Sequence, residues 1–331
     1  MNLAERITLL GKLKTYLEED SEELKAIKQK AFEKNKWFVK EFVDLSIANI
    51  CRFYLNSSLL KKWVAHYHID DNIQSQKIGL VMAGNIPLVG LHDFLCVFIA
   101  GHQQLIKLSE KDDVLLTHII EKLSEWNQQV SEVVKISTML TGCDAYIATG
   151  SNNSARYFHY YFGKYPSLIR NNKTSVAVLT GNETLGQLTS LADDVYVYFG
   201  LGCRNVTKLY VPQGYDFVML LNAFKKYDYL SEMTKYKNNY DYNLTLLIMN
   251  NKFYMTNESL ILVENEALFS PVGELHYSFY KNNDDVLREL CNDANIQCIV
   301  GKENIPFGET QQPGLFDYAD NVDTMQFLLG L

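Results

Sequence analysis

The sequence predicts an α/β protein built around a mostly parallel sheet of βαβ units. Short apolar runs typical of buried parallel strands recur between residues 76 and 180, and stretches with helical periodicity separate them. The same alternation begins again after about residue 200. At 331 residues the chain exceeds the size at which a single core stops growing, so two domains are expected.

The first 75 residues are expected to form a helical segment that packs on the domain that follows. Aliphatic residues recur on one helical face near the N-terminus, at Leu3, Ile7, Leu10, Leu13 and Leu17. Residues 36–54 continue in the same style.

Residues 76–199 are expected to form the first α/β domain. Its predicted strands are KIGLVMA from Lys77, QLIKLS at 104–109, AYIAT at 145–149 and SVAVLT at 175–180. Helices are predicted with Pro87 in the first turn, from near Asp112, and after Ser151, which is a good N-cap residue.

Residues 200–301 are expected to form the second α/β domain. Alternation over Val195–Phe199 predicts a strand, a Gly-Leu-Gly turn follows at 200–202, and another strand is predicted from Lys208. Later helices are predicted from about 215 to 249 and from 284 to 294, with strands near 253, 261 and 275 and at IQCIV. The tail, residues 302–331, ends in an apolar run that we interpret as an oligomerisation strand for pairing with another subunit.

Charge and composition exclude several classes of function. The net charge of −8 disfavours nucleic acid as a partner. No apolar run reaches the roughly 18–20 residues that span a bilayer, and the N-terminus lacks the features of a signal peptide. We therefore expect a cytoplasmic protein without an integral membrane segment. The six cysteines form no CxxC pair, so neither disulfides nor a metal site are expected.

Cys203 is the strongest candidate for a nucleophile. It directly follows the Gly-framed turn at 200–202, where a thiol can be exposed at a cleft and its own N–H can hold an anion. Most unpaired cysteines are small buried apolar residues, so the local sequence alone leaves that alternative open.

Polar residues also follow the predicted strands of the first domain. Asn85 comes after the first strand, where its amide can donate to an oxyanion or simply shape a turn. Lys107 ends the second strand, and Ser109 and Glu110 open the next turn, which can contact ribose hydroxyls or be a solvated loop. Gly150 and Ser151 precede a helix N-terminus suited to phosphate, although the chain has no GxGxxG.

Taken in order, these segments resemble the aldehyde dehydrogenase superfamily. ALFSPVGELHY at 267–277 is similar to its Phe-x-Pro cofactor loop, and IPFGE is similar to its late Pro-Phe-Gly motif. Within the superfamily, residues 76–331 more closely resemble the bacterial acyl-CoA reductases, relatives of the reductase subunit of the bioluminescence fatty-acid reductase complex. The segments that carry this are GNIPLVGLHDFLCV, KLSEKD, ATGSNNSARYFHYYFGKYP, FGLGCRNV and QQPGLFDYADNVDTMQFL.

The resemblance implies nicotinamide dinucleotide binding by residues 76–199 and catalysis by residues 200–301. The implied roles are the nucleophile for Cys203, the side-chain half of the oxyanion hole for Asn85, the adenosine ribose for Lys107, Glu110 and the neighbouring Ser109, the pyrophosphate for Gly150 and Ser151, and the nicotinamide for Phe269. Three histidines, His92, His159 and His276, are expected to be core or surface residues rather than acid–base groups.

One departure from the superfamily pattern points to the reaction. Hydrolytic members carry a Glu that activates water, whereas here Ile169 or a neighbour stands at that place and residues 166–180 contain no acid. A thioester on Cys203 should then exchange with a thiol rather than be hydrolysed. We therefore expect a reductase that converts a fatty acyl-CoA to the aldehyde. The family favours NADPH, and the acid at Glu110 favours NADH.

Other interpretations stay open at this point. One is an NAD(P)-dependent aldehyde dehydrogenase or an acyl-phosphate reductase, which would share the thiol intermediate. Another is a non-catalytic interaction protein of the same fold. Homo-oligomerisation and acyl-transfer partner proteins are further expectations from the resemblance.

Overall fold

The computed structural model describes residues 1–331, which divide into two compact units. Unit 1 comprises Met1–Asn172 and Pro313–Leu331, and unit 2 comprises Lys173–Gln312. The expected boundary at 199/200 therefore lies inside unit 2, because the strand expected at 175–180 pairs with strands of that unit. The tail expected at 302–331 is divided between the two units.

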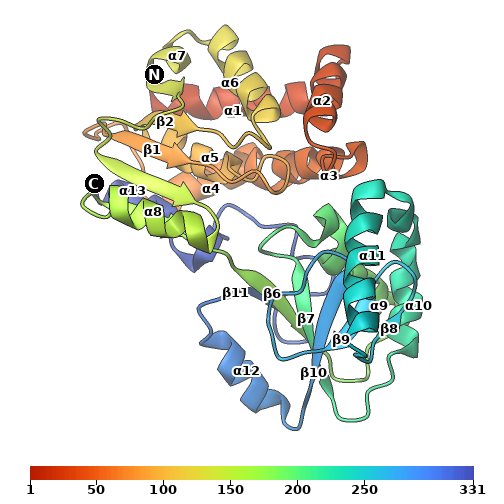
Figure 1. The fold of residues 1–331 in the computed structure, drawn as a ribbon. Coiled ribbons are helices and arrows are strands. Elements are labelled where there is room, and N and C mark those ends of the chain that lie inside the picture. Colours follow the sequence, from red (N-terminus) through yellow and green to blue (C-terminus); the bar gives the residue numbers. More distant parts are fainter. The chain divides into compact units, whose positions relative to one another are not determined.

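Unit 1 contains a five-stranded parallel sheet with the order β3-β2-β1-β4-β5 (Figure 1). The strands are β1 (Lys77–Val81), β2 (Gln103–Lys107), β3 (Val134–Ile136), β4 (Ala145–Thr149) and β5 (Ser167–Arg170). The helices are α1 (Leu3–Glu19), α2 (Glu22–Lys34), α3 (Lys40–Asn49), a π-helix (Ile50–Tyr54), α4 (Ser57–His66), α5 (Leu91–Ala100), α6 (Val114–Trp126), α7 (Gln129–Val133), α8 (Asn152–Phe162), a 3-10 helix (Ala319–Asn321) and α13 (Thr324–Leu329). The predicted helical N-terminus is confirmed.

The two faces of this sheet are covered differently. Ile78 and Leu80 of β1 belong to the main core, which also contains buried residues of α1, α5 and α6. On the opposite face Tyr146 of β4 stacks on Phe162 of α8, with ring centroids 4.2 Å apart. Gly79 lies under Tyr146, and a Cβ there would be 2.7 Å from its ring. The close approach of the ring therefore requires glycine in the middle of β1.

The C-terminal segment is a helix of unit 1, so the predicted oligomerisation strand is wrong. Met325 and Leu328 of α13 are fully buried, and this helix packs on α5. Their spacing of three residues places both on one helical face. His102 Nε2 lies 3.0 Å from the carbonyl oxygen of Leu328, and the hydroxyl of Tyr318 accepts a bond from Trp63 Nε1 at 2.9 Å.

Unit 2 contains a six-stranded sheet with the order β11-β6-β7-β10-β9-β8, parallel except for β8 (Figure 1). The strands are β6 (Thr174–Val178), β7 (Val206–Pro212), β8 (Met255–Thr256), β9 (Ile261–Glu264), β10 (Glu274–Tyr280) and β11 (Ile296–Val300). The helices are α9 (Leu185–Tyr196), a 3-10 helix (Val197–Gly200), α10 (Val218–Phe224), a 3-10 segment (Lys225–Glu232), α11 (Thr234–Met249) and α12 (Asn283–Cys291). Leu290 of α12 packs with Val176 and Val178 of β6, and Tyr240 of α11 packs on β9.

The strand predicted over Val195–Phe199 is wrong. These residues contain the end of α9 and most of the following 3-10 helix. Thr184 and Gln187 form a capping box at the start of α9, and Leu188, Leu191, Ala192 and Val195 are buried at helical spacing. The longer helical period therefore overrides the local alternation of β-branched and aromatic residues. No helix in either unit is long and apolar enough to cross a membrane.

Candidate active site

Cys203 lies on a strained turn between α9 and β7. Tyr198 and Phe199 adopt left-handed backbone conformations, with φ of 54° and 58°, and Gly200 follows at 72°. Aromatic residues rarely adopt this conformation, which costs roughly 1–2 kcal/mol for each residue other than glycine. Such strain clusters at functional sites. The sequence correctly predicted a glycine in the turn, but not the two aromatic residues that share its conformation.

Asn205 holds this turn in place, and sequence reasoning missed it. Its side chain is fully buried. The amide Nδ2 donates to the carbonyl oxygens of Asp194 and Val197 at 3.0 and 2.8 Å, while Oδ1 accepts the N–H of Gly202 at 2.8 Å. One amide therefore joins the end of α9 to the residue before Cys203. An Asn two residues after the cysteine, at the start of a buried strand, is the signal that could have found it.

Cys203 is more exposed to solvent than most other cysteines of the chain. Cys51, Cys96, Cys143 and Cys298 are buried, whereas Cys203 is half-buried and Cys291 is exposed. Burial raises the pKa of Cys51 to about 11 and also raises the pKa of Cys96 and Cys143. These three thiols are poor sources of thiolate. Only Cys203 combines access with a structured turn, since Cys291 is the last residue of α12.

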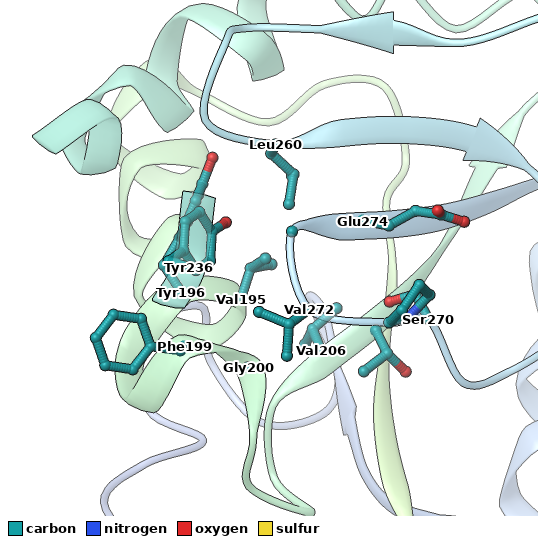
Figure 2. Close-up of a pocket in the computed structure, with 13 residues that line it drawn as sticks. Val195, Tyr196, Phe199, Gly200, Val206, Tyr236, Leu260, Ser270, Val272 and Glu274 are labelled. Atoms are coloured by element: carbon teal, nitrogen blue, oxygen red, sulfur yellow. The ribbon is translucent and has the colours of Figure 1, made fainter. Parts of the chain in front are cut away.

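A small cavity lies behind the turn, entirely within unit 2. Its volume of about 20 Å³ suits one water molecule rather than a substrate. Figure 2 shows the aromatic rings of Phe199, Tyr196 and Tyr236 on one side of it and Ser270 with Glu274 on the other.

Phe269 lies in the exposed loop between β9 and β10, also in unit 2. Its side chain is 42% exposed, so it is accessible to a partner molecule. The structure therefore brings Cys203 and Phe269 into one unit, on segments that adjoin neighbouring strands β7 and β10.

The remaining predicted residues gather at one edge of the unit 1 sheet. In the register of the parallel strands, Val81 of β1 pairs with Lys107 of β2 on one side and Ala148 of β4 on the other. The loops after these three strands carry Asn85, Ser109 with Glu110, and Gly150 with Ser151. Carboxyl ends of parallel strands are where open α/β sheets bind ligands.

The loop that carries Asn85 packs tightly against the turn after β2. A Cβ on Gly84 would lie 2.6 Å from the side chain of Ser109. The buried Asp112 accepts the N–H of Leu88 through Oδ2 at 2.7 Å, and Leu88 has a left-handed φ of 58°. Burial raises the pKa of Asp112 to about 7. Asp112 is therefore a second residue that sequence reasoning missed, with only its place in the KLSEKDD run as a signal.

Ser151 caps α8 as predicted. Its Oγ accepts the N–H of Ser154 at 3.3 Å, and a Cβ on Gly150 would lie 2.8 Å from the ring of Phe158. Glycine at 150 therefore lets the start of the helix approach the strand end, where free N–H groups suit a phosphate. Lys107 and Glu110 are exposed and Ser109 is half-buried.

These features fit a dinucleotide in unit 1. At Gly84 and Gly150 the chain approaches side chains of Ser109 and Phe158 more closely than a Cβ would allow. The last residue of β2 and the turn after it offer a cation, a hydroxyl and a carboxylate. The pyrophosphate role of Gly150 and Ser151 and the ribose role of Lys107, Ser109 and Glu110 stay predictions from the resemblance.

Comparison with protein-family profiles finds no match, and comparison with curated protein sequences finds none either. Solved structures of aldehyde dehydrogenases, however, share the fold. The NAD⁺ complex of the aldehyde dehydrogenase from Bacillus cereus matches with a TM-score of 0.64 and 13% identity, over 92% of this chain and 73% of its own. The NAD-dependent aldehyde dehydrogenase from Sinorhizobium meliloti matches with a TM-score of 0.65 and 14% identity, over 94% of this chain and 72% of its own.

A third solved structure is the P. syringae indole-3-acetaldehyde dehydrogenase AldA in complex with NAD⁺ and IAA. It matches with a TM-score of 0.64 and 13% identity, over 87% of this chain and 69% of its own. The chain therefore has the aldehyde dehydrogenase fold, which confirms the predicted α/β class with a Rossmann-type domain and an α/β catalytic-type domain.

Proposed function

We propose that this protein is a NAD(P)H-dependent acyl-CoA reductase that converts a fatty acyl-CoA to its aldehyde through a thioester on Cys203. One observation carries the proposal: an accessible cysteine on a strained turn in an aldehyde dehydrogenase fold, without an acid where such enzymes activate water. Residues 166–180 contain no Asp or Glu. Instead β5 ends in the buried Arg170, which pairs with Asp93 at 2.6 Å and donates to Thr324 at 2.7 Å.

The first half of the reaction is an acyl transfer. The Cys203 thiolate attacks the carbonyl carbon of the acyl-CoA, the new C–S bond forms, and CoA leaves as its thiolate. The backbone N–H of Cys203 and the side-chain amide of Asn85 are assigned to the oxyanion by the family resemblance. Without a carboxylate to deprotonate water, the acyl group on Cys203 should resist hydrolysis.

The second half is a reduction. A reduced nicotinamide, when bound, supplies the hydride that the acyl carbon accepts. The Cys203 thiolate then leaves as the aldehyde carbonyl forms. Overall, acyl-CoA, NAD(P)H and one proton give aldehyde, CoA and NAD(P)⁺. The role of this chain in that half is to hold the acyl group on Cys203, to exclude water, and to present Phe269 toward the nicotinamide.

A second candidate is an aldehyde dehydrogenase that oxidises free aldehyde. The solved structures that share the fold are aldehyde dehydrogenases described with NAD⁺ or as NAD-dependent, which favours it. The exposed Glu110 in the turn after β2 favours NAD(H) over NADP(H) by like-charge repulsion of a 2′-phosphate, whereas the family resemblance favours NADPH. Our preference is NADPH.

The experiment that tests the proposal is intact-mass analysis after incubation with a fatty acyl-CoA in the absence of a reductant. The parent protein should gain one acyl group, and NADPH should then release it as aldehyde. Cys203→Ala should abolish both events, while the matched control Cys291→Ala, which removes the exposed thiol of the same unit, should retain both. An adduct that persists in Cys203→Ala would reject the assignment. Turnover of free aldehyde or acyl phosphate, but not of acyl-CoA, would favour the alternatives.

A further inference from the structure

The loop that carries Phe269 is fixed by an array of buried side chains. Four consecutive carbonyl oxygens, from 265 to 268, each accept a hydrogen bond from a different side chain of β7 or β10. The donors are Ser278 Oγ to Asn265 at 3.2 Å, Lys208 Nζ to Glu266 at 2.8 Å, His276 Nδ1 to Ala267 at 2.8 Å and Thr207 Oγ1 to Leu268 at 2.7 Å. We call this array the carbonyl ladder.

The loop is exposed to solvent, whereas the side chains that donate to its carbonyl oxygens are buried. Residues 264–267 are exposed, as is Phe269, whereas all four donors are at most 9% exposed. An exposed loop without regular structure is ordinarily mobile. Lys208 is almost fully buried, and burial lowers its pKa. Its ammonium group donates to the carbonyl oxygen of Glu266 and lies 3.6 Å from the exposed carboxylate of the same residue. A buried cation is costly unless it is paired, and here both partners belong to the loop, so Lys208 ties the loop to β7.

The carbonyl ladder also connects to the turn of Cys203 through β6. Thr174 Oγ1 lies 2.5 Å from Thr207 Oγ1. Because the Thr207 hydroxyl donates its proton to the carbonyl oxygen of Leu268, Thr174 is the donor in this pair. The next residue, Ser175, donates to the carbonyl oxygen of Cys203 at 3.0 Å. Two adjacent residues of one strand therefore anchor the thiol turn and the Phe269 loop in the same frame.

We propose that Thr207, Lys208 and His276 are positioning residues, which hold Phe269 in a fixed place for the reductive half of the reaction at Cys203. The inference rests on the proposed function for the nature of that reaction. The physical reason is that transfer between two held groups is sensitive to displacements below 1 Å, and a misplacement of about 1 Å costs as much as a hundredfold in rate. An unanchored loop would sample many positions.

The first test observes the loop without any activity. Phe269→Trp with 5-fluorotryptophan places one new fluorine in unit 2, because the three native tryptophans lie in unit 1. In this background the residue 269 resonance should be single. Thr207→Val and Lys208→Met should shift and broaden or split it. Thr207→Ser, which keeps the hydroxyl, should leave it as in the parent. The control Ser259→Ala removes a buried hydroxyl that bonds Tyr196 in the same unit and should also leave it unchanged.

The second test separates the two halves of the reaction, with Phe269 intact. In Thr207→Val the rate of Cys203 acylation should stay within twofold of the parent. Single-turnover oxidation of NADPH should slow by roughly tenfold, the scale expected of a sub-ångström displacement. The isotope effect with 4-deuterated NADPH should rise, and Thr207→Ser should restore both values.

The outcomes distinguish the inference from the function on which it rests. An unchanged residue 269 resonance in Thr207→Val and Lys208→Met overturns the inference. So does a slowing of acylation and reduction by the same factor, or an isotope effect no larger than in Ser259→Ala. A parent enzyme without acyl-CoA turnover overturns the proposed function alone, and the resonance then decides whether the ladder orders the loop.

Discussion

Two loops that carry predicted site residues are held by opposite means. The loop of unit 1 from 84 to 90, which carries Asn85, depends on a buried carboxylate: Asp112 accepts the N–H of the left-handed Leu88. A hydroxyl also contributes, since Ser46 donates to the carbonyl of Pro87 at 2.8 Å. The loop of unit 2 that carries Phe269 depends on side-chain donors to four carbonyls in succession.

The difference teaches how each loop should respond to its surroundings. The loop from 84 to 90 should depend on pH near neutrality, because one of the groups that hold it is a carboxyl whose pKa is raised to about 7. A loop held at four points should lose its order in steps as donors are removed. Strain also differs: the first loop includes a left-handed leucine, whereas Gly273 supplies the left-handed residue at the end of the second.

The largest expected effect tests whether the loop from 84 to 90 contributes a residue to catalysis in addition to forming a turn. Asn85→Ala should lower kcat by roughly 10²–10³, the usual loss of one oxyanion-hole donor, while cofactor affinity stays nearly unchanged. Steady-state kinetics with acyl-CoA together with NADPH titration measure both. If only KM changes, Asn85 shapes the turn and has no role at the oxyanion.

A second prediction concerns the close packing that joins the first loop to the turn after β2. Gly84→Ala places a Cβ 2.6 Å from Ser109, so it should destabilise unit 1 by about 1–3 kcal/mol and weaken NADPH binding. Urea unfolding followed by tryptophan fluorescence reports on unit 1, which holds all three tryptophans.

The matched control for this substitution is Gly11→Ala in α1. Its nearest neighbour would be Ser57 Oγ at an ordinary 3.7 Å, so the variant should be more stable by up to about 1 kcal/mol. Equal stability of the two variants would mean that the Gly84 contact relaxes without cost.

A third prediction would break the comparison if it failed. The pKa of Asp112 is raised to about 7, so between about pH 4 and pH 7 the carboxyl is protonated in the folded protein and ionised in the unfolded chain. The stability that it contributes is therefore complete at low pH and is lost as pH rises toward 7. The free energy of unfolding of the parent, relative to Asp112→Asn, should fall by at most about 1.4 kcal/mol per pH unit.

Unfolding of both proteins at several pH values, again by tryptophan fluorescence, measures that difference. The amide oxygen that Asp112→Asn introduces can still accept the N–H of Leu88, so the stability of the variant at or below about pH 4 should be close to that of the parent. A difference that does not vary with pH would show that Asp112 stays ionised throughout.

The smallest expected effect is at the exposed end of the same turn. Glu110→Gln removes a negative charge that would face the adenosine ribose, so it should raise the NADPH-to-NADH ratio of kcat/KM by a few-fold. Kinetics with both cofactors give the ratio. An unchanged ratio would indicate that Glu110 does not face the ribose and that the KLSE segment has been aligned incorrectly.

Much of the fold could be predicted from the periodicity of the apolar residues and from the order of strands and helices along the chain. Buried strands such as KIGLVMA and AYIAT, and the Ser151 cap, were found because strand, turn and cap each need a few adjacent residues of a given type. The end of α9 was mistaken for a strand, because Val195–Phe199 has a local alternation that only the full helical period from Thr184 overrides.

The candidate site could be predicted only where single residues have distinctive chemistry. Cys203 stands out as a thiol beside glycines. Asn205, Asp112 and the carbonyl ladder could not be found, because their roles depend on carbonyl and amide groups brought close by the fold. Ordinary Thr, Ser and Asn residues carry no sign in the sequence of which backbone group they will meet.

The return of the chain to unit 1 has a consequence for the order of assembly during synthesis. Residues 313–331 leave the ribosome after all of unit 2, yet they supply Thr324 to the Asp93–Arg170 pair and Tyr318 to the aromatic core near Trp63. Unit 2 is one uninterrupted segment and can complete its fold first. The first residues of unit 1 are made earliest. The surface of α5 that α13 covers nevertheless stays uncovered until the C-terminal residues have been synthesised.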